Sequence, residues 1–216
     1  MSGKTIELVN DPHLGQYFAL KGENSKKAFK NPMASCRVVE LRPDDIVADI
    51  GAYVGEYSIY AAKRVKKVYS YEASPDTFEV LTKNRRANME IYHKAVVGGD
   101  EETVELYLSK GIGATNSIVK KQSKAGSVKV DAINYVDALK DATVVKIDVE
   151  GAEYTYQIIQ PQLRAIILEF HPIAGEDWRG SVDWITTQLA YGGFTCLMMP
   201  GFTSGWDTNS AWIRDI

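Results

Sequence analysis

The sequence contains little cysteine and no long apolar run. Cys36 and Cys196 are its two thiols, and they stand far apart without the C-x-x-C spacing of zinc and redox motifs. We therefore predict no disulfide framework and favour a reducing compartment. Nowhere do about 18 uncharged apolar residues follow one another, and residues 1–9 alternate polar and apolar side chains. We expect a cytoplasmic protein that is neither secreted nor membrane-spanning.

The chain also lacks a strong excess of either charge. Its 216 residues are 45% hydrophobic and 25% charged, with a formal net charge of −3. This composition predicts one globular core and no general attraction to nucleic acid or to an anionic membrane. Local basic clusters such as Lys63-Arg64 and Lys120-Lys121 are most simply solvated helix faces. They leave RNA open as an alternative binding partner.

From residue 46 onward, short apolar runs of β type alternate with helical periods. This alternation predicts an α/β domain over residues 46–216 with a mostly parallel sheet. Residues 1–45 contain two strand-like runs around turn signals, and we interpret them as an N-terminal appendage or lid. We expect strands at residues 46–50, 68–71, 91–97, 144–148, 165–170, 194–199 and 211–213, with antiparallel additions at 104–108 and 128–133. We expect helices after Gly55, from Ser74 to about Asn88, shortly before Pro161, and after an N-cap at Ser181.

The most informative segment is DIGAYVG, residues 49–55, which lies between a predicted strand and a predicted helix. A dinucleotide-binding loop needs G-x-G-x-x-G, but Tyr53 occupies the position of its second glycine. A phosphate-binding P-loop needs Gly-Lys-Ser/Thr at its end, but Glu56 and Tyr57 follow Gly55. Phosphate is therefore disfavoured, and the loop favours a ligand without phosphate at the carboxyl edge of the sheet.

Two acids indicate which ligand this is. Asp49 is available for a cationic amino group, and Glu72 ends the second strand, where an acid can accept hydrogen bonds from both ribose hydroxyls. A nucleoside that lacks phosphate and carries an amino acid is S-adenosylmethionine (SAM). We predict that SAM is the cofactor and that its binding residues are Asp49, Gly51, Tyr53, Gly55, Glu72, Ala73, Ala95 and Asp148.

The second informative segment is KIDVEGAE, residues 146–153, at the end of the fourth predicted strand. Methyl transfer from a sulfonium is an in-line displacement, so the enzyme must align the nucleophile and remove a proton. We predict Asp148, Glu150 and His171 as catalytic residues, and Glu153 and Glu169 are further candidates for the base. We assign no metal ligand. A divalent metal on Asp148, Glu169 and His171 stays an alternative, because spacing cannot establish the ligand count.

The chain resembles the FkbM-type methyltransferases, a branch of the class I SAM-dependent superfamily. The resemblance covers about residues 46–172 and is carried by DIGAYVGEYS, EASP, GATNS, KIDVEGAE and LEFH at residues 49–58, 72–75, 113–117, 146–153 and 168–171. It implies a three-layer Rossmann-like sandwich with a seven-stranded sheet, SAM bound by residues 49–55 and Glu72, and O-methylation of a hydroxyl on a sugar or secondary metabolite. Three positions depart from the family pattern: Tyr53 where Asn is common, Ala73 where Pro is frequent, and Asn134 where a Leu-Asp pair is usual.

We therefore expect a SAM-dependent O-methyltransferase that acts on a small molecule or glycan. The alternatives are an RNA methyltransferase and a SAM-binding module without activity. The acceptor pocket is expected from the segments 1–45, 109–127, 172–181 and 200–210, including a Gly-rich loop at 111–117 that could close over a ligand. Trp178 and Trp206 lie in predicted loops and could stack on a sugar ring.

Overall fold

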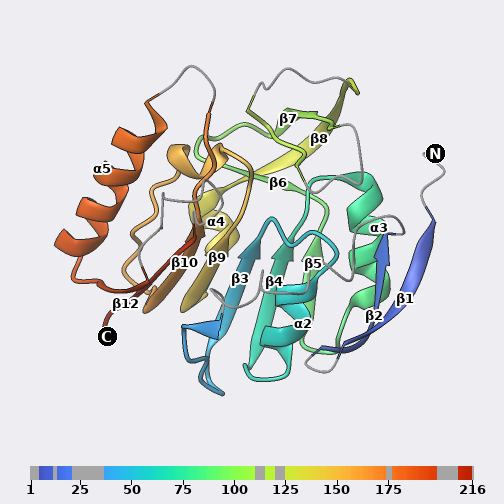
Figure 1. Cartoon of the computed structure of the whole chain (residues 1–216), viewed down its shortest axis with the longest axis horizontal. Coiled ribbons are helices and arrows are strands. Elements are labelled where there is room, and N and C mark those ends of the chain that lie inside the picture. Colours follow the sequence, from blue (N-terminus) through green and yellow to red (C-terminus); the bar gives the residue numbers. More distant parts are fainter. Residues whose placement is uncertain are drawn as a thin grey trace.

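The central feature of the computed structural model is a seven-stranded sheet with the strand order β11-β12-β10-β9-β3-β4-β5 (Figure 1). The structure describes residues 5–11, 14–20, 37–109, 115–119, 125–173, 177–198 and 209–215. β12 is antiparallel to both of its neighbours, whereas the five strands from β10 to β5 are mutually parallel. The strands are β3 (Ile46–Ile50), β4 (Lys67–Tyr71), β5 (Met89–Tyr92), β9 (Val144–Ile147), β10 (Ala165–Glu169), β11 (Thr195–Met198) and β12 (Asn209–Ile213). The predicted mostly parallel, seven-stranded sheet is confirmed.

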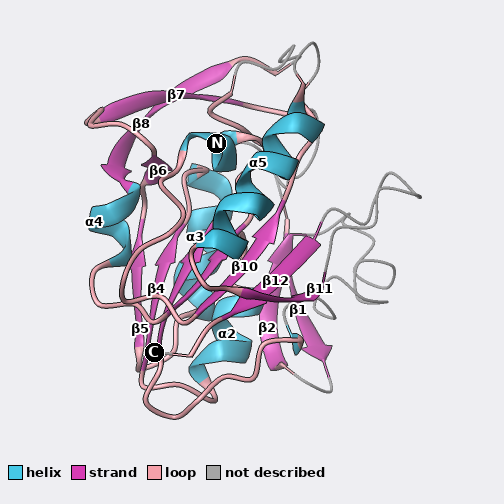
Figure 2. Cartoon of the chain, turned by 90° about the vertical axis from the view of Figure 1, so that its left-hand side faces the viewer, coloured by secondary structure: helices cyan, strands magenta, loops and turns pink. Residues whose placement is uncertain are grey.

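Helices cover both faces of this sheet. They are α2 (Glu56–Ala62), α3 (Pro75–Asn84), α4 (Tyr135–Leu139), the 3-10 helix η2 (Ala152–Thr155) and α5 (Trp178–Tyr191). Figure 2 shows α5 lying across the sheet on one side. Successive side chains of β3 enter different cores, because Val47 packs with α2 and α3 while Ala48 and Ile50 pack with α4 and α5. The result is the three-layer sandwich that the sequence predicts. None of the described helices combines the length and the apolar composition of a membrane span.

A second, three-stranded sheet lies beyond the carboxyl ends of the central strands (Figure 1). Its order is β6-β8-β7, with β6 (Ala95–Val97), β7 (Thr103–Tyr107) and β8 (Ser127–Asn134). β7 and β8 are antiparallel, as predicted. The prediction of one strand over residues 91–97 is wrong, because the chain breaks at His93 and Lys94 and β6 pairs with β8 instead of the central sheet. The partner residues of β6 lie 37 positions later in the chain, for example Ala132 opposite Ala95, which periodicity cannot show.

The N-terminal segment forms a hairpin, β1 (Ile6–Asp11) and β2 (Gly15–Leu20), that packs on α3. The Asn84 amide bonds both main-chain groups of Phe18, with Oδ1 accepting at 2.7 Å and Nδ2 donating at 2.8 Å. Tyr17 and Leu20 are buried in the core shared with α2 and α3. The predicted N-terminal appendage is therefore a hairpin docked on the domain. The boundary at residue 45 and a role as a lid stay predictions.

Several helix boundaries differ from those expected. α3 ends at Asn84 and not near Asn88, since Arg85 has extended backbone angles. Asp177 caps α5, so Trp178 starts a helix and the predicted cap at Ser181 is wrong. The short helix expected before Pro161 is the single 3-10 turn η2. Asn134 accepts a bond from Val136 N and caps α4, a helix that the sequence reading missed. Trp206 and residues 111–114 lie outside the described residues.

Candidate active site

The loop between β3 and α2 turns through three residues with positive φ. Gly51 has φ +77°, and a Cβ there would come within 1.8 Å of the Asp148 carbonyl oxygen, so glycine is required where this loop approaches the end of β9. Gly55 has φ +93° and precedes α2. Tyr53 has φ +54°, a left-handed conformation that Asn adopts more readily than Tyr. The departure from the family pattern at this position therefore costs backbone strain.

Glu72 ties this loop to the end of β4. Its Oε2 accepts a bond from Tyr53 N at 2.8 Å, and its Oε1 accepts bonds from Ser74 N and Thr77 Oγ1, both at 2.8 Å. The side chain is 9% exposed, and burial raises its pKa to about 7 in spite of these bonds. A carboxylate has about four acceptor positions, so three internal donors leave room on Oε2 for one donor from a ligand. Binding of both ribose hydroxyls stays a prediction.

Lys146 connects the two acids at the carboxyl ends of β3 and β9. Its Nζ lies 3.1 Å from Asp148 Oδ2 and 3.6 Å from Asp49 Oδ1, and it donates to Gly51 O at 3.1 Å. Asp49 is fully buried and accepts from Ser58 Oγ at 2.5 Å, and burial raises its pKa against the opposing pull of Lys146. Lys146 is not among the predicted site residues. The signal was present as one charge in the otherwise apolar strand β9.

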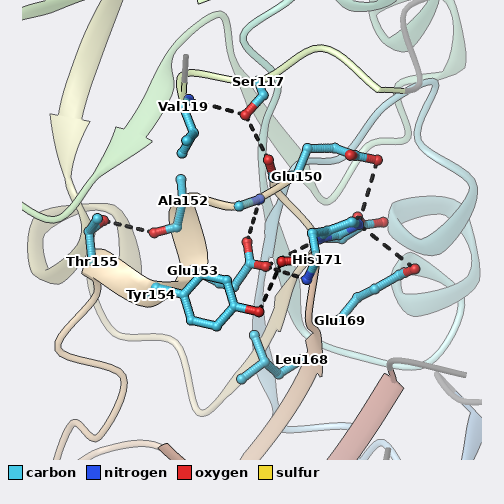
Figure 3. Close-up of polar contacts among 12 residues, drawn as sticks. Ser117, Val119, Glu150, Ala152, Glu153, Tyr154, Thr155, Leu168, Glu169 and His171 are labelled. Carbon is cyan, nitrogen blue, oxygen red and sulfur yellow. Dashed lines mark hydrogen bonds and ion pairs between the residues drawn. The ribbon is translucent and has the colours of Figure 1, made fainter. Parts of the chain in front are cut away.

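His171 lies among four carboxylates, three from the segment after β9 and one from Glu169 at the end of β10. Figure 3 shows Glu150, Glu153 and Glu169 around it. Its Nε2 is 3.6 Å from Asp148 Oδ1, 3.5 Å from Glu150 Oε1 and 3.9 Å from Glu169 Oε1. Its Nδ1 is 3.3 Å from Oε1 of Glu153, which also accepts the His171 main-chain N–H at 2.6 Å. The catalytic residues predicted from the sequence, Asp148, Glu150 and His171, are therefore neighbours in space.

The charges of this cluster shift one another's pKa. Burial lowers the pKa of His171, but its bond to Glu153 and the nearby Asp148 and Glu150 raise it to about 9. Burial and the charge of Asp148 raise the pKa of Glu169 to about 7. Asp148 shows the opposite direction, because Lys146 and His171 outweigh burial and lower its pKa. At neutral pH His171 is thus protonated and Asp148 is ionised.

A cavity of about 220 Å³ opens between the loop after β3, the end of β4 and the end of β9. It lies where the chain reverses direction in the strand order, between β3 and β9, which is the usual ligand position in such sheets. Three predicted residues do not line it, namely Asp49, Gly55 and His171. Those predicted residues that do line it are Gly51, Tyr53, Glu72, Ala73, Ala95, Asp148 and Glu150.

Residues 49–196, more than half of the chain, match the Methyltransferase FkbM domain. The chain belongs to the FkbM methyltransferase family. Over 119 residues it is 32% identical to a probable cobalt-precorrin-6B C(15)-methyltransferase (decarboxylating) of Methanococcus maripaludis, covering 45% of this chain and 66% of that protein. Over 157 residues it is 25% identical to an uncharacterized protein of Methanocaldococcus jannaschii, covering 62% of this chain and 59% of that one.

The fold is similar to that of a solved FkbM protein. The crystal structure of Methyltransferase FkbM from Methylobacillus flagellatus KT matches with a TM-score of 0.53 and 13% identity, covering 82% of this chain and 45% of that one. At this identity the match shows the fold alone. The chain spans less than two thirds of the length of each of these three proteins.

Membership in the FkbM family implies SAM as the cofactor, and the cavity fits this molecule chemically. Val96, Leu106 and Ile118 supply apolar wall for a flat base. Glu72 supplies an acceptor for a hydroxyl donor, and Asp148 stands on the β9 side of the cavity. Asp49 lies behind Lys146, so contact between its carboxylate and the methionine amino group stays a prediction.

Proposed function

We propose that this FkbM protein transfers the methyl group of SAM to a hydroxyl oxygen of a small molecule or glycan. The observation that carries the proposal is the position of Asp148. Its carboxylate lines the cavity at the end of β9, is one third exposed, and is held by Lys146 through Oδ2 while Oδ1 faces His171. A hydroxyl nucleophile must lose its proton during methyl transfer, and an ionised carboxylate at the cofactor cavity can accept that proton.

Each residue of the site is assigned a role in this reaction. Bound SAM supplies a methyl group on a positively charged sulfur. The acceptor oxygen would take this methyl group while the electrons of the broken carbon–sulfur bond stay on sulfur, and Asp148 would accept the hydroxyl proton. Lys146 keeps Asp148 ionised and aimed. His171 is protonated at neutral pH, so we assign it to orienting the acids instead of accepting the proton.

Asp148→Asn tests this assignment. The chain and its variant are incubated with methyl-labelled SAM and a panel of hydroxylated small molecules and glycans, and transfer is counted for each acceptor. We expect turnover to fall by at least about 100-fold, as when a general base is removed. Affinity for the demethylated product of SAM, measured by calorimetry, should stay within a few-fold.

Three outcomes would count against parts of the proposal. Unchanged turnover in Asp148→Asn would remove this carboxylate from the mechanism. Binding of the demethylated product without transfer to any acceptor would favour a module that binds SAM without activity. Transfer to RNA in place of the panel would favour the alternative acceptor, and that binding should weaken steeply with added salt.

A further inference from the structure

Carboxylate oxygens, which are common metal ligands, gather around Nε2 of the His171 ring. Nε2 lies 3.5–3.9 Å from one oxygen each of Asp148, Glu150 and Glu169. One donor atom from each of Asp148, Glu150 and His171 lies within 4.8 Å of the other two. Donors bound at about 2.1 Å to one ion are about 3.0–3.4 Å apart when adjacent, so the three side chains would have to move together by up to about 1.4 Å to share a cation.

Glu153 holds the His171 ring at Nδ1, the nitrogen on the other side from Nε2, as carboxylates do for histidines that bind metals. Oε1 of Glu153 lies 3.3 Å from Nδ1 and accepts the His171 main-chain N–H at 2.6 Å. Its other oxygen accepts from Gly151 N at 2.8 Å, and Glu153 is fully buried. Metal-binding histidines usually donate a hydrogen bond from their other ring nitrogen to such a carboxylate. This bond orients the remaining nitrogen toward the ion. Figure 3 shows Glu153 on one side of the ring and Glu150 and Glu169 beyond its other nitrogen.

The charge of the cluster also favours a cation. Among the described residues, the carboxylates of Asp148, Glu150, Glu153 and Glu169 surround His171. Lys146 approaches through Oδ2, so Oδ1 of Asp148 faces the histidine. Asp148, Glu150 and Glu169 line the cavity, which gives an ion a path of entry.

We propose that Asp148, Glu150 and His171 bind one divalent transition-metal cation at the wall of the cofactor cavity, with Glu169 beside it. Mixed imidazole and carboxylate donors suit Mn²⁺, Fe²⁺ or Zn²⁺ better than Ca²⁺. If the proposed function holds, the ion lies where it can bind the acceptor hydroxyl oxygen and lower its pKa, which selects acceptors that offer oxygen ligands.

The test is a titration of the purified chain with Mn²⁺, followed by the electron paramagnetic resonance signal of the free ion. We expect one Mn²⁺ per chain, and His171→Gln and Asp148→Asn should each weaken binding by at least about tenfold. Glu153→Gln, which removes the carboxylate behind the ring, should weaken binding by about 10-fold to 100-fold. The control is Glu79→Gln on α3, an exposed acid paired with Lys83, which should bind as the unaltered chain does.

Absence of stoichiometric binding, or equal binding by the unaltered chain and His171→Gln, overturns the proposal. Unfolding midpoints of each variant establish that it is folded, and Glu150→Gln replaces any that is not. The titration contains no acceptor, so its failure leaves the proposed methyl transfer standing. Mn²⁺ binding by a chain that transfers no methyl group supports the metal site and counts against the proposed function alone.

Discussion

The two ends of the central sheet handle buried charge in opposite ways. At the amino end, Asp45 and Arg164 form a buried pair in which Arg164 Nε donates to Oδ1 at 2.7 Å and a second nitrogen contacts Oδ2. Thr143 Oγ1 also donates to Asp45, at 2.9 Å. At the carboxyl end, His171 lies among four carboxylates at 3.3–3.9 Å.

The pKa of one acid at each end shows what this difference means. Burial raises the pKa of Asp45, but Arg164, Arg42 and Thr143 together lower it below the ordinary value. Burial and Asp148 raise the pKa of Glu169 to about 7. The amino end is therefore arranged for stability, whereas the carboxyl end keeps like charges together at a cost, which is typical of sites that bind or react.

The largest effect is expected at the amino end. Arg164→Met removes one partner of a buried pair and leaves Asp45 charged without its cation. The free energy of unfolding should fall by about 3–5 kcal/mol, as measured by urea denaturation. Lys83→Ala provides the control, since it breaks an exposed pair with Glu79 and should cost under about 1 kcal/mol. Losses of similar size in both variants would refute a structural role for the amino-end pair.

The next largest loss of stability is expected in the loop after β3, where Gly51 meets the main chain at the end of β9. Gly51→Ala forces a Cβ into the Asp148 carbonyl at 1.8 Å, and Gly126→Ala places one where no atom lies within 4 Å. Both glycines have positive φ, +77° and +89°, so backbone strain is similar in the two variants. We expect Gly51→Ala to lose about 2–4 kcal/mol and Gly126→Ala about 1–2 kcal/mol. Equal losses by urea denaturation would mean that the approach of residue 51 to β9 is not tight.

How far the sequence predicts this site depends on the range of the contacts involved. The loop at residues 49–55 and the meeting of Asp148 with His171 follow from local pattern, because parallel strands place their carboxyl ends at one edge. The departure of β6 to another sheet depends on pairing with β8, which no local period encodes. The contact of Asp49 with Lys146 and that of Glu153 with His171 also join distant segments, so local pattern does not predict them.

Glu72 offers a pH test within the carboxyl end. Burial raises its pKa from an ordinary 4.5 to about 7, so the folded chain holds this proton more tightly than the unfolded chain. The stability from this group is fully present below about pH 4.5 and is lost as pH rises to about 7, a change on the order of 2–3 kcal/mol. Glu72→Gln should lack this slope in urea denaturation across the same range. If variant and unaltered chain show the same pH dependence, Glu72 is ionised throughout.

The smallest effect separates two acids of the same cluster. Glu169→Gln removes a charge that Asp148 repels, so it should raise the free energy of unfolding by about 1 kcal/mol above pH 7. The gain should vanish near pH 5, because the raised pKa of Glu169 means that its carboxyl is already protonated there. Urea denaturation at the two pH values measures both parts of this prediction.

Glu153→Gln should have the opposite sign. Glu153 is fully buried and accepts from Gly151 N at 2.8 Å and His171 N at 2.6 Å, so losing its charge weakens bonds to main-chain donors and to the imidazole. If both variants destabilise the chain at pH 8, the acids at this end are held as firmly as Asp45. The two ends of the sheet would then differ in the number of buried charges and not in the cost of repulsion between them.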